Sequence, residues 1–237
     1  MQGHLHPVTQ FFRKVIKSFK ELGFEIVEGP EKETEWYNFD SLRMPDDHPA
    51  RDIQDTFWLK NGEVMRTHTS ASQVRTMEKR TPPARIVVPG RCFRRENTDA
   101  SHEHTFYQLE GMVIDKNITV ANMIGTLEEF AKKIFGKNIK FRVRTNLYPF
   151  VEPGFDIDIT CTICKGKGCN VCKQTGWLEV MPCGMIHPIV LKNMGIDPNK
   201  YSGFAFAFGI DRLVMLEKGV KDIRLFYSSD LRFLKQF

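Results

Sequence analysis

The sequence predicts an α+β fold in which helices flank an antiparallel β-sheet. Apolar residues recur at helical spacing in two segments, several short runs have the composition of strands, and a tight turn at Asn61-Gly62 joins two of those runs. Neighbouring strands joined by such a turn pair antiparallel. The 237 residues suffice for one substantial core and 41% of them are hydrophobic, so we expect one domain over residues 1–237.

Two amphipathic helices are expected. The first begins near Thr9, a candidate N-cap, and ends at Gly23. Its apolar face consists of Phe12, Val15, Ile16 and Phe19. The second ends before Gly136, and its apolar face consists of Met123, Leu127, Phe130 and Ile134. Both helices have one apolar face to pack against the sheet.

Strand candidates occupy much of the remaining chain. Residues 56–59 and 63–66 form the hairpin around Asn61-Gly62. The further candidates are residues 85–88, 91–96, 106–111, 141–144, 155–159, 177–181 and 204–208. Residues 31–55 are rich in charge and turn formers, and we interpret them as a long ordered loop or as a subunit contact. Their apolar anchors are Trp36, Tyr37 and Phe39.

The strands at 91–96 and 106–111 are joined by a polar loop suited to contact phosphate. The loop, residues 97–105, holds Asp99, His102, Glu103 and His104. Side chains alternate along a strand, so Arg94 shares a face with Glu96, and Phe106 shares one with Gln108 and Glu110. An arginine fork matches an α-phosphate, glutamates accept hydrogen bonds from an adenine amine or a substrate ammonium, and a phenylalanine stacks on a base. These residue types indicate a nucleotide-activating site.

A second arginine comes from a distant segment. The apolar strand at 204–208 stops at Gly209, and Asp211 and Arg212 follow at the start of a helix. A helix N-terminus adds partial positive charge and free N–H groups, so Arg212 is a candidate anchor for a terminal phosphate. The alternative is that Asp211 and Arg212 form a solvated helix cap.

Together these segments resemble the three motifs of class II aminoacyl-tRNA synthetases. Residues 23–30, which end in Pro30, resemble the first motif. The strands at 91–96 and 106–111 resemble the second, and Gly209-Ile210-Asp211-Arg212 resembles the third. Within that class, four segments resemble the α subunits of bacterial phenylalanyl-tRNA synthetases: residues 67–70, 106–111, 148–154 and 203–206. The resemblance extends from Gly3 to Leu234. It implies the class II synthetase core, here an antiparallel sheet flanked by helices.

The resemblance implies activation of phenylalanine with ATP to an adenylate, followed by transfer to tRNA(Phe). In this reading Arg94 holds the α-phosphate, while His102 and Arg212 neutralise the departing pyrophosphate. Phe106 and Glu96 seat the adenine. Mg²⁺ bridges phosphate oxygens, with Glu152 as its candidate protein ligand.

The resemblance also implies an amino-acid pocket. Tyr148 and Phe150 contact the substrate ring, and Val151 and Ala205 shape the depth of the pocket. The polar end of the substrate is held by Trp58, His68, Ser70, Gln108 and Glu110. Taken singly, Trp58 and Phe150 also fit plain core aromatics, and His68 fits a hydrogen-bonded strand residue. Many relatives have phenylalanine at the position of Tyr148 and glycine at that of Ala207.

Four cysteines form two C-x-x-C knuckles within residues 161–172. They are Cys161, Cys164, Cys169 and Cys172. Such knuckles can supply four thiolates to a structural Zn²⁺, although the segment between them is much shorter than the ~15–20 residues usual between paired knuckles. The alternative is a set of reduced thiols without metal. We interpret the segment as an insertion that braces a surface loop, and expect Cys92 and Cys183 to be buried.

Composition limits the location and the partners. The net charge of +5 gives weak support for a nucleic-acid partner, and no apolar run reaches the ~18 residues of a membrane span. No signal peptide is recognised and clustered cysteines suit a reducing compartment, so we expect a cytoplasmic protein. The resemblance implies a β subunit and an α2β2 assembly.

Two further expectations concern the tRNA. The N-terminal helical arm with which bacterial α subunits contact tRNA is absent before Gly3, which suggests a shortened chain or a reduced homologue. Alternative functions are a class II paralogue that activates an amino acid without charging tRNA, and a noncatalytic module that binds RNA or a protein partner.

Overall fold

The computed structural model describes residues 3–95, 97–100 and 102–237. Its α-helices are α1 (Pro7–Glu21), α2 (Glu35–Asn38), α3 (Ser70–Met77), α4 (Val120–Phe135), α5 (Pro188–Asn193), α6 (Ile210–Lys218) and α7 (Leu231–Leu234). Three 3₁₀ turns are η1 (Asp40–Leu42), η2 (Pro49–Arg51) and η3 (Ile223–Phe226). The strands are β1 (Glu25–Ile26), β2 (Lys32–Glu33), β3 (Val64–Met65), β4 (Ala84–Phe93), β5 (Thr105–Asp115), β6 (Phe141–Tyr148), β7 (Val151–Thr160), β8 (Trp177–Ile186) and β9 (Ser202–Gly209).

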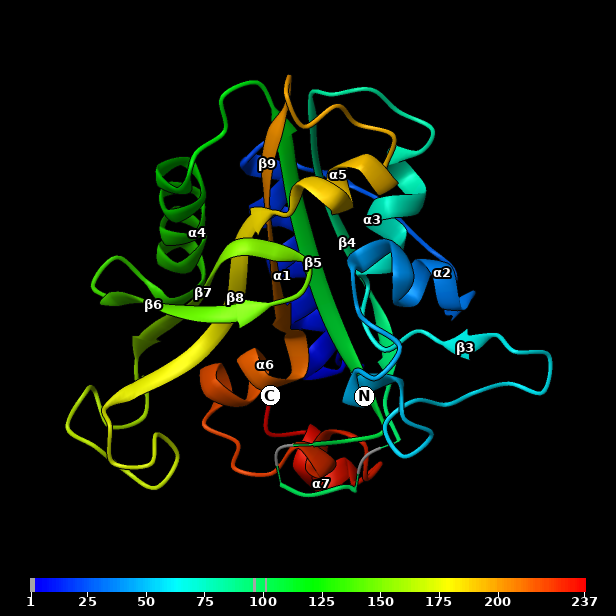
Figure 1. Ribbon diagram of the computed structural model, residues 1–237. Coiled ribbons are helices and arrows are strands. Elements are labelled where there is room, and N and C mark those ends of the chain that lie inside the picture. Colours follow the sequence, from blue (N-terminus) through cyan, green and yellow to red (C-terminus); the bar gives the residue numbers. More distant parts are fainter. Residues whose placement is uncertain (1–2, 96, 101) are drawn as a thin grey trace.

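A seven-stranded sheet in the order β1-β4-β5-β9-β8-β7-β6 forms the centre of the molecule (Figure 1). Its strands pair antiparallel except at one edge, where β1 pairs parallel with β4. The predicted α+β class is therefore confirmed, with one parallel pair that the sequence did not indicate. Because β1 has only two residues, it carries no periodicity from which its direction can be predicted.

Two apolar layers cover the two faces of this sheet (Figure 1). On one face, α1, α4 and α6 pack against alternate residues of the central strands, including Val87 and Leu109. On the other face, α3, α5 and the η1 segment pack against the residues between them, including Ile86 and Met112. The strict alternation in β5 places Gln108 and Glu110 on the second face, with Met112 and Ile114.

The helices lie close to their expected positions. α4 ends at Gly136 as predicted, and α1 buries Phe11, Val15 and Phe19. The predicted N-cap of the first helix was wrong: His6 is the N-cap, its Nδ1 accepts a hydrogen bond from the Val8 N–H, and Pro7 occupies the first helical position.

The bounds of two predicted strand regions differ from those in the structure. The candidates at 85–88 and 91–96 belong to one strand, β4, which ends at Phe93, so Arg94 lies at the start of the loop rather than within a strand. The predicted hairpin around Asn61-Gly62 is reduced to one isolated bridge, between Trp58 and Val64. The strand β3 pairs with β2 instead of with residues 56–59. Residues 31–55 contain α2, η1 and η2, with Phe39 fully buried as an anchor.

Candidate functional site

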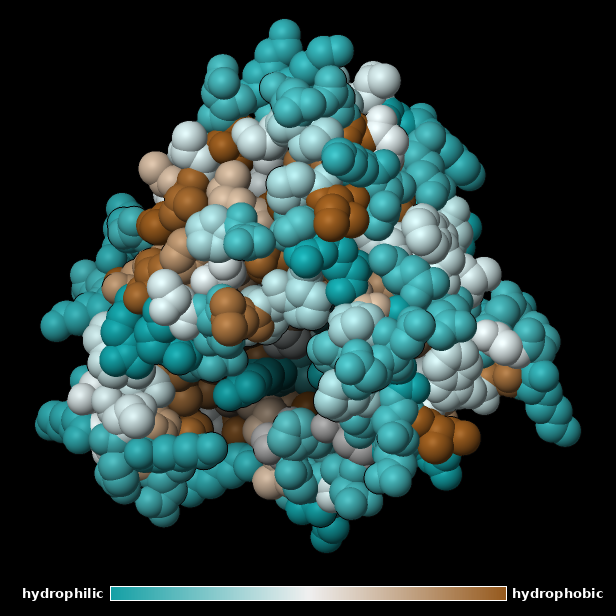
Figure 2. All heavy atoms as spheres, viewed as in Figure 1, coloured by the Kyte–Doolittle hydropathy of each residue, from teal (hydrophilic) through white to brown (hydrophobic). Residues whose placement is uncertain are grey.

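A cavity of about 620 Å³ opens on the second face of the sheet, and Figure 2 shows this side of the molecule hollowed near its centre. It lies among β5, β8, β9, the β6–β7 turn, the start of α3 and the η1 segment. Its polar lining includes Thr67, His68, Ser70, Gln73, Arg94, Gln108 and Glu110. Its apolar lining includes Leu42, Met44, Leu147, Tyr148, Phe150, Val151, Ala205, Phe206 and Ala207. Most residues predicted for the amino-acid pocket thus meet in one cavity.

Glu110 is the centre of the polar end. It is 4% exposed, and its Oε1 accepts hydrogen bonds from the Thr69 N–H at 3.1 Å and from Gln108 Nε2 at 2.9 Å. Its Oε2 accepts a hydrogen bond from the Ser70 hydroxyl. Burial raises the pKa of Glu110 to about 7, although the bonds from Ser70 and Thr69 and the charge of Arg94 act in the opposite direction. The site therefore offers an acceptor whose charge changes near neutral pH.

His68 lies beside this network as a neutral donor and acceptor. Burial lowers its pKa to about 3, and the charge of Arg94 acts in the same direction. Among the described residues, neither ring nitrogen of His68 has a hydrogen-bond partner, and the same is true of Gln73 Nε2. Buried polar atoms are almost always paired, so these unpaired atoms indicate a polar ligand in the cavity.

The aromatic end is formed by the β6–β7 turn. The rings of Tyr148 and Phe150 stack with centroids 5.7 Å apart and planes 23° apart. Val151 and Ala205 line the cavity next to them. An aromatic wall with small apolar neighbours is suited to bind a flat apolar ring.

Arg94 lies at the edge of the cavity, between the polar end and the loop. Its Nε donates to the Thr67 carbonyl at 3.1 Å, and its guanidinium carbon lies 4.9 Å from the centroid of the Phe106 ring. Phe106, predicted to seat adenine, does not line the cavity but is covered by this guanidinium. Arg94 and Phe106, both predicted to contact ATP, therefore lie close together, although Arg94 is in the loop and not in the predicted strand.

Backbone hydrogen bonds hold the loop between β4 and β5 at its base and at its far end. The Arg94 N–H donates to the His104 carbonyl at 2.9 Å, and the Ile223 N–H donates to the Ala100 carbonyl at 2.9 Å, which places the loop beside the C-terminal segment (Figure 1). His102 is exposed and its Nδ1 lies 2.9 Å from Asp99 Oδ2. Glu96, predicted to contact adenine, lies outside the described residues.

Asp211 and Arg212 have different surroundings at the start of α6. Arg212 is exposed, and within the described part of the chain it has no hydrogen bond or ion pair. Asp211 is 1% exposed and accepts hydrogen bonds from the Tyr107 N–H and the Tyr227 hydroxyl. Burial raises the pKa of Asp211. The solvated-cap alternative was therefore wrong for Asp211, which attaches α6 to β5.

Trp58, predicted to hold the polar end of the substrate, and Glu152, predicted to bind Mg²⁺, also lie outside the cavity lining. Trp58 packs 6.2 Å from Phe39 between ring centroids, and its Nε1 donates to the Arg51 carbonyl at 3.1 Å, so in this structure it is the core aromatic of the alternative reading. The Glu152 side chain is 75% exposed, and its Oε2 lies 3.3 Å from His187 Nε2. A single exposed carboxylate fits Mg²⁺ only if water and phosphate oxygens supply the other ligands, which is usual for this ion.

Arg66, which was not predicted from the sequence, connects the first motif to β4. Arg66 is 2% exposed and donates to the carbonyls of Gly29 and Pro30 at 3.0 and 3.2 Å and to the Arg91 carbonyl at 2.7 Å. A Cβ atom at Gly90 would lie 2.0 Å from this guanidinium. A glycine opposite an arginine was the only available signal, and it is a weak one.

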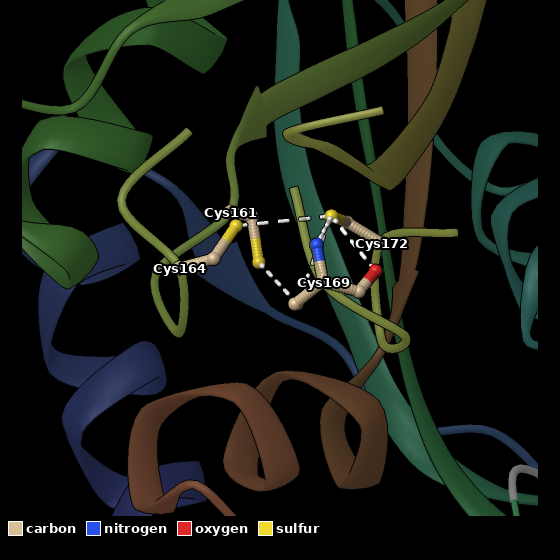
Figure 3. Close-up of side chains that lie close together, drawn as sticks. All are labelled: Cys161, Cys164, Cys169 and Cys172. Carbon is tan, nitrogen blue, oxygen red and sulfur yellow. Dashed lines mark hydrogen bonds between the residues drawn. The ribbon is translucent and has the colours of Figure 1, made fainter. Parts of the chain in front are cut away.

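The four cysteines converge at the β7–β8 connection (Figure 3). Their sulfur atoms all lie within 4.8 Å of one another, and the pairs Cys161–Cys169, Cys164–Cys172 and Cys169–Cys172 are 3.8, 3.8 and 3.7 Å apart. All four thiols are free of disulfides. The short segment between the knuckles therefore does not prevent the four sulfurs from meeting. Cys92 and Cys183 are buried, as predicted.

Within the described residues, no helix is both long and apolar enough to cross a membrane.

Comparisons with known proteins agree with this geometry. The family model described as the tRNA synthetases class II core domain (F) matches residues 1–237. The phenylalanine–tRNA ligase alpha subunit of Leptospira biflexa is 54% identical over 236 residues, which cover 100% of this chain and 69% of that protein. That of Clostridium perfringens is 53% identical over 235 residues, which cover 99% and 69%.

A solved structure shares the fold. Pyrrolysyl-tRNA synthetase from Desulfitobacterium hafniense superimposes with a TM-score of 0.69 over 94% of this chain and 73% of that one, at 21% sequence identity. At this identity the likeness concerns the fold alone.

Proposed function

Since the chain belongs to the class II tRNA synthetase core family and, within it, to the phenylalanine–tRNA ligase alpha subunits, we propose that it activates phenylalanine with ATP and transfers the phenylalanyl group to tRNA(Phe). Residues 1–237 act as one catalytic domain in this proposal, with the four-cysteine segment as an insertion.

One observation carries the proposal: a single cavity has a polar end and an aromatic end of the kind that phenylalanine needs. Glu110 and Gln108 offer acceptors for the substrate ammonium, and Tyr148 and Phe150 offer a stacked wall for its ring. The unpaired nitrogens of His68 supply a further polar contact. The substrate carboxylate is then directed toward Arg94 at the edge of the cavity.

The proposed reaction is an in-line attack of the phenylalanine carboxylate on the α-phosphate of ATP, with pyrophosphate as the leaving group. Arg94 holds the α-phosphate, and Arg212 and His102 neutralise the charge of the pyrophosphate. Phe106 stacks on the adenine once Arg94 has turned from its ring to the phosphate. Mg²⁺, bound in part by Glu152, would neutralise charge on the phosphate oxygens. Catalysis rests on positioning and charge neutralisation.

The adenylate is then attacked by a hydroxyl of the terminal ribose of the tRNA, which releases AMP. The name alpha subunit, borne by the relatives, implies a β subunit as partner, and we propose an α2β2 assembly in the cytoplasm. We expect isolated α chains to pair through the first motif, which Arg66 joins to β4.

The deciding experiment is amino-acid-dependent ATP–pyrophosphate exchange, measured on the chain alone and with its cognate β subunit. We expect exchange with phenylalanine and, with the β subunit present, charging of tRNA(Phe). Exchange without charging in the complex would instead identify a paralogue that only activates an amino acid. Absence of exchange in both states would overturn the proposal.

The cysteine cluster supports a second proposal, that of a structural zinc site. For a Zn–S bond of about 2.3 Å, the sulfurs of a regular tetrahedron lie about 3.8 Å apart, which is close to the three sulfur–sulfur distances given above. The N–H groups of Gly168, Cys169 and Gly176 donate to sulfurs at 3.2–3.3 Å, an arrangement that stabilises thiolates.

Elemental analysis of anaerobically purified protein tests the zinc site. We expect about one zinc per chain in the parent protein, and none in Cys164→Ser. Cys92→Ser is the matched control, because Cys92 is buried elsewhere and should not change the zinc content. Zinc-free protein with four titratable thiols in the 161–172 segment would show that the cluster holds no metal.

A further inference from the structure

Tyr148 is part of the cavity wall, yet its hydroxyl is bonded to two side chains that do not line the cavity. The hydroxyl donates to Asp156 Oδ1 at 2.7 Å and accepts from Asn146 Nδ2 at 3.0 Å. Neither Asp156 nor Asn146 lines the cavity. The ring therefore faces the substrate space while its polar atom is held on the other side.

Asp156 is almost completely buried and depends on few donors. It is 1% exposed, and its Oδ2 accepts from Asn146 Nδ2 at 2.8 Å and lies 3.5 Å from an Arg144 nitrogen. A buried carboxylate that loses a donor is strongly destabilised, so the bond from Tyr148 is costly to break. Burial and the Asp156 carboxylate both raise the pKa of Tyr148, so its hydroxyl stays protonated and continues to donate.

The backbone of β7 at Gly154 packs against the Tyr148 ring. Gly154 pairs with Asn146 in the β6–β7 ladder, and a Cβ atom at Gly154 would lie 3.3 Å from Tyr148 Cδ2 and 2.7 Å from the Asn146 carbonyl oxygen. The ring thus lies against the strand at Gly154, stacks on Phe150, and is held at its far end by Asp156. These three contacts leave it one orientation.

We propose that Asp156 is a positioning residue for amino-acid selection: it fixes the Tyr148 ring as a wall and keeps the Tyr148 hydroxyl out of the ring-binding space. This inference rests on the proposed activation of phenylalanine. While the hydroxyl is held, the aromatic end presents no hydrogen-bond partner to a hydroxylated ring such as that of tyrosine. If the hydroxyl is released, it can enter the cavity and pair with that substrate. An apolar pocket rejects a hydroxylated analogue by only ~100-fold, so a freed partner would weaken the selection measurably.

The test measures exchange kinetics of the complex with the β subunit for phenylalanine, tyrosine and ATP. Asp156→Asn leaves one acceptor oxygen for two donors, Tyr148 and Asn146. We expect the KM for phenylalanine to rise ~10-fold, the preference for phenylalanine over tyrosine to fall ~10-fold, and the KM for ATP to stay unchanged. If Asp156→Asn fails to fold, Asn146→Ser gives the same measurement, because Asn146 is exposed and its loss weakens the same network.

A double variant separates positioning from a merely structural role. In a Tyr148→Phe background no hydroxyl can be released, so adding Asp156→Asn should change the phenylalanine-to-tyrosine preference by less than ~3-fold. Asp158→Asn is the matched control: Asp158 is equally buried, but its bonds go to Arg142 and Arg144 and to neither the Tyr148 hydroxyl nor Asn146, which helps to hold that hydroxyl in place, so the preference should be retained.

An equal loss of preference in both backgrounds, or in Asp158→Asn, would overturn the positioning role. Failure of the parent complex to activate phenylalanine would instead refute the proposed function, and the two failures are therefore distinguishable.

Discussion

The two ends of the candidate site differ in how firmly their residues are held. The amino-acid end is made by the buried strands β5 and β9 and by the β6–β7 turn, and Glu110 alone receives three hydrogen bonds. The three charged groups proposed for the phosphates of ATP, which are Arg94, His102 and Arg212, lie on a loop or at a helix end. His102 and Arg212 are exposed, and Arg94 rests on Phe106, where adenine is expected. The proposed amino-acid pocket is therefore formed without a ligand, and we expect the proposed ATP subsite to be completed by its ligand.

The largest expected effect follows from removing Arg94. In Arg94→Ala the phosphate end loses the one arginine or lysine that lines the cavity among the described residues, while Gln108, Tyr148 and Phe150 are left in place. We expect kcat for exchange to fall ~100- to 1,000-fold. The Kd for phenylalanine, measured by calorimetry, should rise much less, by ~5-fold, because the charge of Arg94 also lowers the pKa of Glu110. Retention of normal exchange would contradict the assignment, and a large loss of phenylalanine affinity would show that the two ends are not independent.

Glu110 tests the opposite end. Glu110→Gln removes the charge that we assign to the substrate ammonium, and the KM for phenylalanine should rise ~50-fold, with a much smaller change in the KM for ATP. Because the pKa of Glu110 is raised to about 7, the carboxylate is scarce below that pH and predominant above it.

The corresponding pH dependence has a definite sign. In the parent enzyme the KM for phenylalanine should fall about 10-fold between pH 6 and pH 8, as Glu110 loses its proton. Glu110→Gln should abolish this dependence. A variant that retained the full pH profile would place the titrating group elsewhere.

Arg212 sharpens the comparison on the ATP side. Arg212→Ala should raise the KM for ATP ~10-fold, an effect that weakens at high salt because Arg212 is exposed, and should leave the KM for phenylalanine unchanged. Lys218→Ala, at the other end of α6, is the matched control and should alter neither value. Equal behaviour of the two variants would mean that Arg212 is a solvated helix residue.

The parts of the fold that the sequence predicted are those determined by neighbours along the chain. Most strands of the large sheet, the C-terminal end of α4 and the start of α6 follow from apolar residues at regular spacing and from glycines close by. The cysteine cluster was harder to predict, because the short segment between the two C-x-x-C knuckles argued against four sulfurs meeting at one site. The turns contain Lys165 and Lys173 at positive φ, besides glycines, and this tight winding brings the sulfurs together.

The hydrogen bonds that were not predicted join residues far apart in the sequence. Asp211 bonds to Tyr107, 104 positions earlier, and Arg66 bonds to Gly29, 37 positions earlier. Trp58, by contrast, was placed in the pocket by resemblance, and in this structure it packs beside Phe39 and away from the cavity. Burial and long-range pairing cannot be read from a single sequence, so the amino-acid end was predicted by residue type but its supports were not.

The smallest effect is expected for a substitution of His68. This substitution tests whether His68 contacts the substrate as a neutral group or gains a proton when the substrate binds. His68→Ala removes a neutral hydrogen-bonding group from the cavity, and the KM for phenylalanine should rise ~5-fold. Because the pKa of His68 is lowered to about 3, the ring is neutral from pH 5.5 to 8, and the factor should be the same at both ends of that range. The measurement is the ratio of KM values for variant and parent enzyme across this range, which cancels the contribution of Glu110. A ratio that changed with pH would show that His68 gains a proton when substrate binds, and the polar end would then adjust to its ligand as the ATP subsite does.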